Sequence, residues 1–257
     1  MMKKTMRSAW LGIVLLFMYL PVMILAVYSF TDTATIGTHG NFSLQNYKTL
    51  FTTGELLGMI GGTFALAIGS ACIATILGTI GAIGAFYSKK GTRGAIDFVN
   101  QVPVVNAEVV TGFSICVLLI VVLGLSKDSF FPLIVGHVVL EAPFVYLSVL
   151  PKLKQMDNSI YEAALDLGCN PKQAFFKVIL PEISPAILSA FLICLTYSID
   201  DFMISYFNCG TVETLPIAIY SMTRKKVSPE IYALSTIMFV VILSVILVSN
   251  AMESRSY

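Results

Sequence analysis

Six long apolar runs, separated by polar segments, make up most of this chain. A helix that crosses a bilayer needs about 20 predominantly apolar residues, and each run reaches about that length. The runs cover approximately residues 9–30, 59–87, 102–125, 130–150, 185–207 and 232–250. The pattern therefore predicts an all-α, polytopic membrane protein with six transmembrane helices, in which residues 1–257 form a single transmembrane domain.

The first apolar run follows a basic stub that contains Lys3, Lys4 and Arg7. A cleaved signal peptide has the same basic start, but its apolar region is only about 7 to 15 residues long. Residues 9–30 make a run of 22, so we expect a retained span. In the polar stretch that follows, we expect residues 42–51, FSLQNYKTLF, to form a short surface helix.

Small residues recur at every fourth position of the second run. Such spacing lets helices approach closely in lipid, where no hydrophobic force drives them together. We interpret it as a packing signal and not as chemistry. The positions are Gly61, Ala65 and Gly69 on one helix face and Ala74, Gly78 and Ala82 on another.

The segment between the fourth and fifth runs is amphipathic, and residues 161–185 read YEAALDLGCNPKQAFFKVILPEISP. We expect a first helix that begins near Asp157 or Asn158, because either side chain can cap exposed backbone N–H groups. It would run to Leu167. Gly168 would follow in the left-handed conformation that ends many helices.

A second helix is expected directly afterwards. Asn170 is a good N-cap, Pro171 suits the first helical position, and Gln173 can complete a capping box. Pro181 and Pro185 are expected to end this helix, because proline removes a hydrogen-bond donor and clashes with the preceding turn.

These residues resemble the EAA motif of ABC-importer permeases, which runs Glu-Ala-Ala, three residues, Gly, nine residues, Ile, one residue, Leu-Pro. The matching positions are Glu162, Ala163, Ala164, Gly168, Leu180 and Pro181, with Val178 in place of Ile. The resemblance implies the type I ABC-importer permease fold, with residues 152–184 as a cytoplasmic loop of coupling helices that docks on an ATPase. The chemistry agrees, because a carboxylate offers a partner for an arginine. An ordinary helical hairpin is the alternative.

The composition agrees with a membrane protein, because only 12% of the residues are charged, against about 25% in soluble domains. The two histidines and five cysteines show neither CxxC spacing nor a zinc pattern, so we expect no disulfide, metal or cofactor. The chain also lacks the glycine-rich phosphate-binding loop of ATPases. We therefore expect a non-catalytic subunit, with no nucleic acid among its partners.

The basic residues outside the runs predict an orientation, because cytoplasmic loops are enriched in Lys and Arg. With the N-terminus inside, the inner segments hold 11 basic residues and the outer segments hold 5. We therefore expect both termini and the EAA-like loop on the cytoplasmic side of a bacterial cell membrane. The outer cluster from Arg224 to Lys226 is either a solvated turn or a patch that faces an acidic surface of an extracellular binding protein.

Four acidic residues fall inside the predicted spans, where ionisable groups are costly and point to function. They are Glu108, Glu141, Asp200 and Asp201. The spans carry no Lys or Arg, and His137 lies four residues before Glu141 on the same helix face. An excess of negative charge at successive depths favours a cationic solute over an anion or a sugar. For Glu108 and Glu141, a structural role as protonated or hydrogen-bonded acids is the alternative.

Adjacent aspartates on a helix point about 100° apart, so we expect one of Asp200 and Asp201 to face the pathway. Asp201 would share its helix face with Tyr197 and Ser205, and an aromatic ring beside a carboxylate suits an ammonium group. We expect Asp201 to line the pathway and Asp200 to be hydrogen-bonded between helices.

Residues 197–237, YSIDDFMISYFNCGTVETLPIAIYSMTRKKVSPEIYALSTI, are similar to the corresponding part of spermidine/putrescine permeases of the PotC type. The resembling positions are 200, 201, 205, 213, 215, 216, 219–222, 227–230, 233, 234, 236 and 237. The resemblance implies a polyamine importer built from this permease, a second homologous permease, two ATPase subunits and an extracellular (periplasmic) polyamine-binding protein. It also implies that Glu108 is the acid found early in the third span, whereas Glu141 matches no family motif.

Three other functions are open. The first is an ABC importer for another small cation or a neutral solute. The second is a secondary transporter or channel that works without ATP, for which we see no inverted repeat of the two halves. The third is an intramembrane enzyme, but His137 and Glu141 give only an HxxxE spacing without a third ligand.

Overall fold

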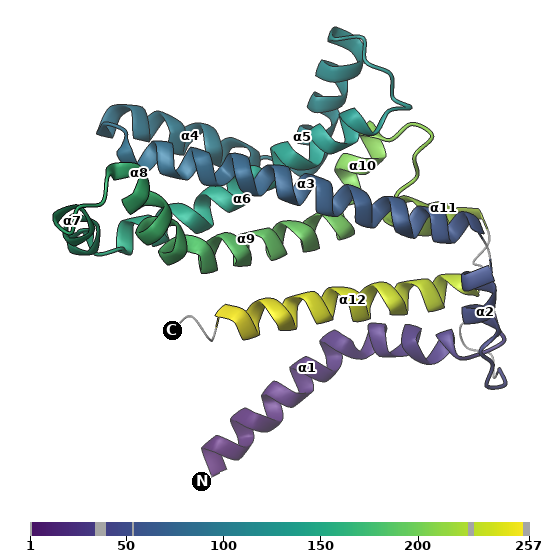
Figure 1. Ribbon diagram of the computed structural model, residues 1–257. Helices are drawn as coiled ribbons and strands as arrows, with labels where there is room; N and C mark the ends of the chain where they lie inside the picture. The colour runs from purple at the N-terminus through teal and green to yellow at the C-terminus, as the bar shows by residue number, and fades with distance from the viewer. Residues whose placement is uncertain (1, 34–39, 53, 226–228, 254–257) are drawn as a thin grey trace. The chain divides into compact units, whose positions relative to one another are not determined.

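Helices account for nearly all of the described chain (Figure 1). The computed structural model describes residues 2–33, 40–52, 54–225 and 229–253. The helices are α1 (Met2–Ser29), α2 (Gln45–Thr52), α3 (Gly54–Tyr87), α4 (Lys90–Val105), α5 (Glu108–Cys116), α6 (Phe130–Gln155), α7 (Asn158–Asp166), α8 (Pro171–Ala174), α9 (Leu180–Asp200), α10 (Met203–Asn208), α11 (Leu215–Lys225) and α12 (Glu230–Glu253), with π-helical turns η1 (Val117–Val122) and η2 (Phe175–Ile179). The predicted all-α fold is confirmed.

Within the described residues, five helices have the length and apolar composition of a membrane span. They are Trp10–Ser29, Leu57–Tyr87, Phe130–Gln155, Pro171–Asp200 and Glu230–Val248. A sixth candidate is a bent pair, Lys90–Val105 followed by Glu108–Val122, in which the two helices meet at 102°. Each predicted apolar run thus overlaps one of these candidates, although two of the runs have different ends.

The third predicted run, residues 102–125, differs from the structure at its start. Residues up to Val105 belong to α4, and Asn106 and Ala107 have extended backbone with ψ of 146° and 133°. The carbonyl of Ala107 then accepts hydrogen bonds from Val110 N and Thr111 N at 2.9 and 3.1 Å, which starts α5. The chain therefore turns before Glu108 instead of continuing as one straight helix.

The fifth predicted run, residues 185–207, differs at both ends. Pro181 and Pro185 do not end the preceding helix, because α8, η2 and α9 continue from Pro171 to Asp200. The wide turn η2 lies directly before the first turn of α9, which holds Pro181. A π-helical turn relieves the clash that a proline ring makes in a regular helix. At the other end, the chain leaves the helix after Asp200, and α10 is a separate short helix.

The chain divides into two units, Met1–Gly58 with Ala218–Leu243 and Met59–Ile217 with Ser244–Tyr257. In the first unit, the Asn46 side chain of α2 donates to the carbonyls of Ser29 and Thr31 at 3.2 and 2.8 Å. These bonds hold α2 against the end of α1. The short helix predicted within residues 42–51 is thereby confirmed as α2.

The core of the second unit lies between α3, α6 and α9, which run side by side in Figure 1. A Cβ atom on Gly78 of α3 would stand 2.6 Å from both the Ala142 carbonyl and the Val145 Cβ of α6. Ala74 and Ala82, on the same face of α3, are fully buried. The packing role predicted for this face is therefore confirmed.

The other small-residue face of α3 packs differently. A Cβ atom on Gly61 or Gly69 would meet no described atom within 4 Å, and Ala65 is exposed. Within the described part of the second unit, this face of α3 remains open.

Candidate functional site

The EAA-like segment folds locally as its capping residues predict. The Asp157 carboxylate accepts a hydrogen bond from Ser159 N at 2.9 Å and so caps α7, and this bond lowers the pKa of the Asp157 carboxyl. Gly168 has a φ of +89°, the left-handed region that ends a helix at little cost only for glycine. The predicted start and stop of the first helix are confirmed.

The second helix of the segment begins with the predicted capping box. Gln173 N donates to Asn170 Oδ1 at 2.9 Å, and Asn170 N donates to Gln173 Oε1 at 3.1 Å. Pro171 occupies the first helical position. Farther along, Lys152 Nζ lies 3.4 Å from Glu182 Oε1, which joins the end of α6 to the start of α9.

Several residues of the motif lie on the surface of this chain. Glu162 and Ala163 are exposed, whereas Ala164 is buried. Large apolar side chains beside them are also exposed, with Leu167 at 87% and Phe176 at 63%. These exposed apolar side chains and the exposed acid Glu162 are available for contacts with another protein.

Most of the predicted pathway residues gather around one cavity of about 310 Å³ in the second unit, which we call the acidic cavity. Its acids come from the start of α5, from the end of α9 and from the break that follows. The lining residues are Glu108, Leu140, Tyr197, Asp200, Asp201, Phe202 and Met203. The bend before α5 brings Glu108 to this place, because Glu108 opens the new helix.

Asp200 and Asp201 both line the acidic cavity but differ in burial and in hydrogen bonding. Asp200 is exposed, whereas Asp201 is 8% exposed and accepts hydrogen bonds from Ile204 N at 3.2 Å and Ser205 N at 2.9 Å. The prediction assumed a continuous helix through both residues. The helix ends instead, because Asp201 has extended backbone with ψ of 122° and its carboxylate caps the first amide groups of α10.

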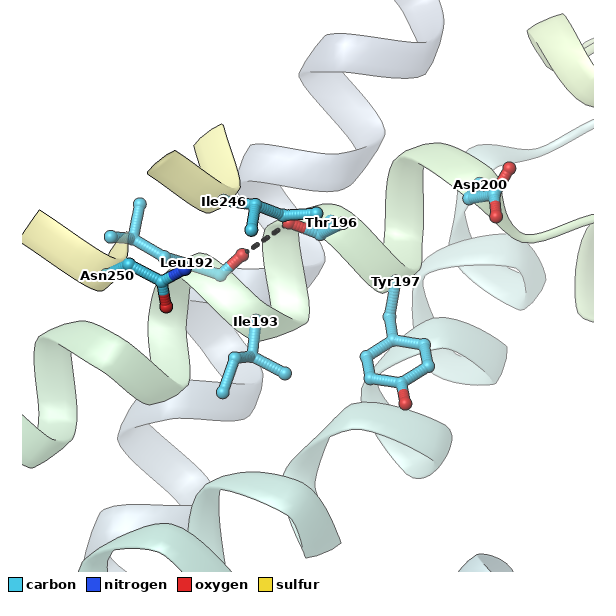
Figure 2. A pocket seen from close by; sticks show the side chains of 7 residues that line it. All are labelled: Leu192, Ile193, Thr196, Tyr197, Asp200, Ile246 and Asn250. Carbon is cyan, nitrogen blue, oxygen red and sulfur yellow. Dashed lines mark hydrogen bonds between the residues drawn. The ribbon is translucent and has the colours of Figure 1, made fainter. Parts of the chain in front are cut away.

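A second cavity of about 280 Å³ lies along α9 and is mainly apolar (Figure 2). It is lined by Leu192, Ile193, Thr196, Tyr197, Asp200, Ile246 and Asn250. Thr196 Oγ1 donates to the Leu192 carbonyl at 2.9 Å, so that hydroxyl is satisfied within its own helix. Tyr197 and Asp200 border both cavities.

Six buried polar side chains form a group that we call the His137 network. They are Ser70, His137, Glu141, Ser198, Asp201 and Ser205. They come from α3, α6, α9, the break after α9 and α10. None is more than 8% exposed, and unpaired polar groups in such surroundings are costly.

His137 is the centre of this network. Its Nδ1 lies 2.9 Å from Ser198 Oγ and its Nε2 lies 3.1 Å from Ser205 Oγ. A carboxylate stands on each side, with Nδ1 3.7 Å from Glu141 Oε1 and Nε2 3.7 Å from Asp201 Oδ2. The predicted proximity of His137 and Glu141 on one helix face is confirmed.

Ser70 closes the network from α3. Its hydroxyl lies 3.0 Å from Ser198 Oγ and donates to Glu141 Oε1 at 3.2 Å. Glu141 and Ser205, both expected on the pathway, lie in the interior of the unit and are not among the residues that line the acidic cavity. Sequence reasoning missed Ser70 and Ser198, because a serine in an apolar span usually bonds only to its own helix backbone.

The basic cluster at 224–226 is described only in part. The Arg224 guanidinium lies 5.8 Å from the ring centre of Tyr220, which is a cation–π contact. Lys226 lies outside the described residues.

The membrane-length helices define a multi-pass membrane protein as the class of protein. The family model described as "Binding-protein-dependent transport system inner membrane component" matches residues 74–255. The chain belongs to this family, and it is therefore an inner-membrane permease of the ABC-importer type. Members of this family are transport components rather than catalysts.

Two relatives show the similarity along nearly the whole chain. The putrescine transport system permease protein PotI of Escherichia coli (strain K12) is 34% identical over 242 residues, which cover 90% of this chain and 86% of that protein. The spermidine/putrescine transport system permease protein PotC of Haemophilus influenzae is 30% identical over 252 residues, which cover 98% of this chain and 97% of that protein.

Solved structures share the fold. A bacterial ABC transporter that imports the acidic polysaccharide alginate matches with a TM-score of 0.72 at 19% identity, over 99% of this chain and 98% of that one. The MetNI methionine ABC transporter, in an inward-facing conformation, matches with a TM-score of 0.65 at 16% identity, over 79% of this chain and 96% of that one. At these identities the likeness concerns the fold alone.

Proposed function

We propose that this chain is one of two permease subunits of an ATP-driven polyamine importer, and that the ammonium groups of the solute pass the acidic cavity. The observation that carries the proposal is that Glu108, Asp200 and Asp201 gather around one cavity beside Tyr197. Carboxylates within membrane-spanning segments mark ion and substrate pathways, and three of them suit a solute with several positive charges. The names of the two relatives, a putrescine and a spermidine/putrescine permease, support this choice.

Tyr197 is held in a position to contact a cation. Its ring stacks on Phe144 of α6, with centroids 4.9 Å apart and planes at 17°. The stack orients the tyrosine ring at the border of both cavities, beside Asp200. A fixed aromatic face near a carboxylate attracts an ammonium group through both cation–π and charge interactions.

Asp200 is the acid that we assign to direct contact with the solute. It is exposed, it borders both cavities, and the second cavity has an apolar wall formed by Leu192 and Ile193 of α9 and Ile246 of α12. A linear polyamine has the matching chemistry, with ammonium groups separated by methylene chains. The apolar wall would pack against those methylene groups while the carboxylate binds the charge.

We assign coupling to the EAA-like segment. Its exposed Glu162, Ala163, Leu167 and Phe176 would dock on an ATPase subunit, with Glu162 paired to a basic side chain. α6 enters the segment and the continuous helix α8–α9 leaves it, so both helices that flank the acidic cavity lead to the docking surface. ATP binding and hydrolysis by the partner would thereby move the walls of the pathway.

The assembly that we propose contains a second homologous permease, two ATPase subunits and an extracellular or periplasmic polyamine-binding protein. Both termini and the EAA-like segment would lie in the cytoplasm, as the distribution of basic residues predicts. A complex of the alginate transporter with an alginate-bound periplasmic protein supports the last partner by analogy.

The test is uptake by the full complex in proteoliposomes with an external polyamine-binding protein. Asp200→Asn should raise the KM for a linear polyamine about tenfold to a hundredfold, since charged hydrogen bonds contribute about 1.5–3 kcal/mol. Asp128→Asn changes an exposed acid in the turn before α6 and should leave KM unchanged. An unaltered KM for Asp200→Asn would count against the acidic cavity as the ligand path.

The same vesicles separate the other candidate functions. Uptake of a neutral solute or an amino acid in place of a polyamine would identify another ABC importer. Uptake that continues after ATP is removed would identify a secondary transporter or channel.

A further inference from the structure

A histidine with a buried carboxylate on each side is an unusual arrangement within membrane-spanning helices. Nδ1 of His137 faces Glu141 Oε1 and Nε2 faces Asp201 Oδ2, both at 3.7 Å. His137 and Glu141 are each 1% exposed. An imidazolium at this point would balance one of the two negative charges that surround it.

The ionisable groups that face His137 come from two places, Glu141 on α6 and Asp201 in the break after α9. α9 and α10 contribute the hydroxyls of Ser198 and Ser205. The remaining titratable neighbour is the Cys194 thiol, which donates to the Glu141 carbonyl at 3.6 Å. His137 therefore has acids and hydrogen-bond acceptors around it, and no described cation competes for them.

Asp201 connects this interior group to the solute path. It lines the acidic cavity and at the same time lies against His137. The negative charge that a ligand meets in the cavity thus depends on whether the histidine behind Asp201 carries a proton. Asp200 has no such partner in the His137 network, because it faces the two cavities instead.

We propose that His137 is a specificity-determining residue that sets the charge of the acidic cavity. When it is protonated, it neutralises Asp201 and leaves Glu108 and Asp200 to attract the solute. When it is neutral, the charge of Asp201 is added and the cavity attracts polycations more strongly. This inference rests on the proposed function, because it concerns the charge of the same cavity.

The direction in which pH changes the charge of the acidic cavity follows from this arrangement. Raising the pH removes the proton of an imidazolium, whereas alkyl ammonium groups stay protonated to well above neutral pH. Raising the pH should therefore make the cavity more negative while the ligand remains a cation. The KM for a diamine should fall by roughly threefold to tenfold, as expected for one added charge at a distance of about 10 Å in a partly screened site. The KM for a triamine should fall further, since it carries one more charge.

The experiment measures KM against pH in proteoliposomes that contain the full complex and one fixed binding protein. His137→Gln and His137→Asn each keep a hydrogen-bonding amide near one ring nitrogen but cannot gain a proton. The binding protein contributes the same pH dependence of KM to every complex. Beyond this contribution, the wild-type KM should change with pH, and the KM of both variants should not. Asp201→Asn should raise the KM at every pH, because the acidic cavity then lacks one carboxylate.

Glu141→Gln separates charge from structure. This variant removes a carboxylate that lies against His137 but does not line the acidic cavity, so KM should still fall as the pH rises. A merely structural role for His137 would instead reduce uptake by the same factor at every pH. Thermal melting and basal ATP hydrolysis of each variant complex check assembly.

Two results would overturn the inference: a wild-type slope that persists in both His137 variants, or a KM in Asp201→Asn that equals the wild-type value at every pH. The Asp200→Asn variant distinguishes this failure from failure of the proposed function. If KM is unchanged in Asp200→Asn, the cavity is not the ligand path and both proposals fall. If Asp200→Asn is impaired but His137→Gln keeps the slope, only the role of His137 is lost.

Discussion

Asp200 and Asp201 are neighbours in the chain but stand in different environments. Asp200 is exposed to two cavities, whereas the carboxylate of Asp201 turns inward, accepts two backbone N–H groups and lies 3.7 Å from His137. The end of α9 between them makes this difference possible. Asp200 is therefore open to the solute, whereas Asp201 lines the acidic cavity and also stabilises the break.

The first prediction concerns the aromatic ring at the cavity. Tyr197→Leu should raise the KM for a polyamine by about threefold to thirtyfold, since cation–π contacts contribute about 0.5–2 kcal/mol. Tyr197→Phe is the matched control, because it keeps the ring and its stack on Phe144. Uptake kinetics in proteoliposomes measure both. Equal kinetic constants for the two variants would show that the ring itself does not meet the cation.

The second prediction concerns coupling. Glu162→Lys should abolish the stimulation of ATP hydrolysis by loaded binding protein while the purified permease still folds, because a reversed charge repels a basic partner. Asp166→Lys makes the same change on an exposed acid one turn farther along α7 and should have a much smaller effect. Normal coupling in Glu162→Lys would exclude this residue from the docking surface.

The third prediction concerns the close approach of α3 and α6. Gly78→Ala should destabilise the protein by about 1–3 kcal/mol, because the added methyl group would overlap the Ala142 carbonyl and Val145. Gly84→Ala, in the same helix, meets no atom within 4 Å and should not destabilise it. Thermal melting in detergent compares them. A similar loss in both variants would mean that glycine is needed for some reason other than space.

The fourth prediction concerns pH and the start of α7. The hydrogen bond from Ser159 lowers the pKa of Asp157, so the cap is fully present above the ordinary pKa of an aspartate and is lost as the pH falls through the lowered value. Hydrogen exchange at the Ser159 amide should therefore lose protection in acid. Asp157→Asn, which caps without titrating, should not show this change relative to an unstructured peptide. Parallel pH profiles for the two proteins would contradict the role of the carboxylate.

Local sequence signals predicted the elements with good accuracy where the determinants are local. The capping box of Asn170 and Gln173 and the left-handed Gly168 appear as expected, because each depends on residues within one turn. The prolines 181 and 185 misled the prediction, since a π-helical turn before them lets the helix continue. A wide turn of this kind has no clear pattern in the sequence.

The acids themselves were visible in the sequence, because charged side chains are rare in apolar runs. Their arrangement in space was not visible in the sequence. The prediction assumed a straight helix through Asp200 and Asp201, whereas the helix ends after Asp200 and the Asp201 carboxylate accepts a hydrogen bond from Ser205 N. Glu141 was recognised as unusual, but its hydrogen-bond partner Ser70 lies 71 residues away in the chain.

The sequence by itself determined that this protein spans a membrane with helices and where those helices are capped. It also identified the acids that lie in apolar segments, where a charged side chain is energetically costly. These properties depend on composition and on neighbours within a few residues. Only the tertiary structure decided that Glu108, Asp200 and Asp201 meet at one cavity and that Asp201 also lies against His137. Those outcomes depend on a helix break and on contacts such as that of Ser70 with Ser198, 128 residues apart, which the packing of α3, α6 and α9 creates.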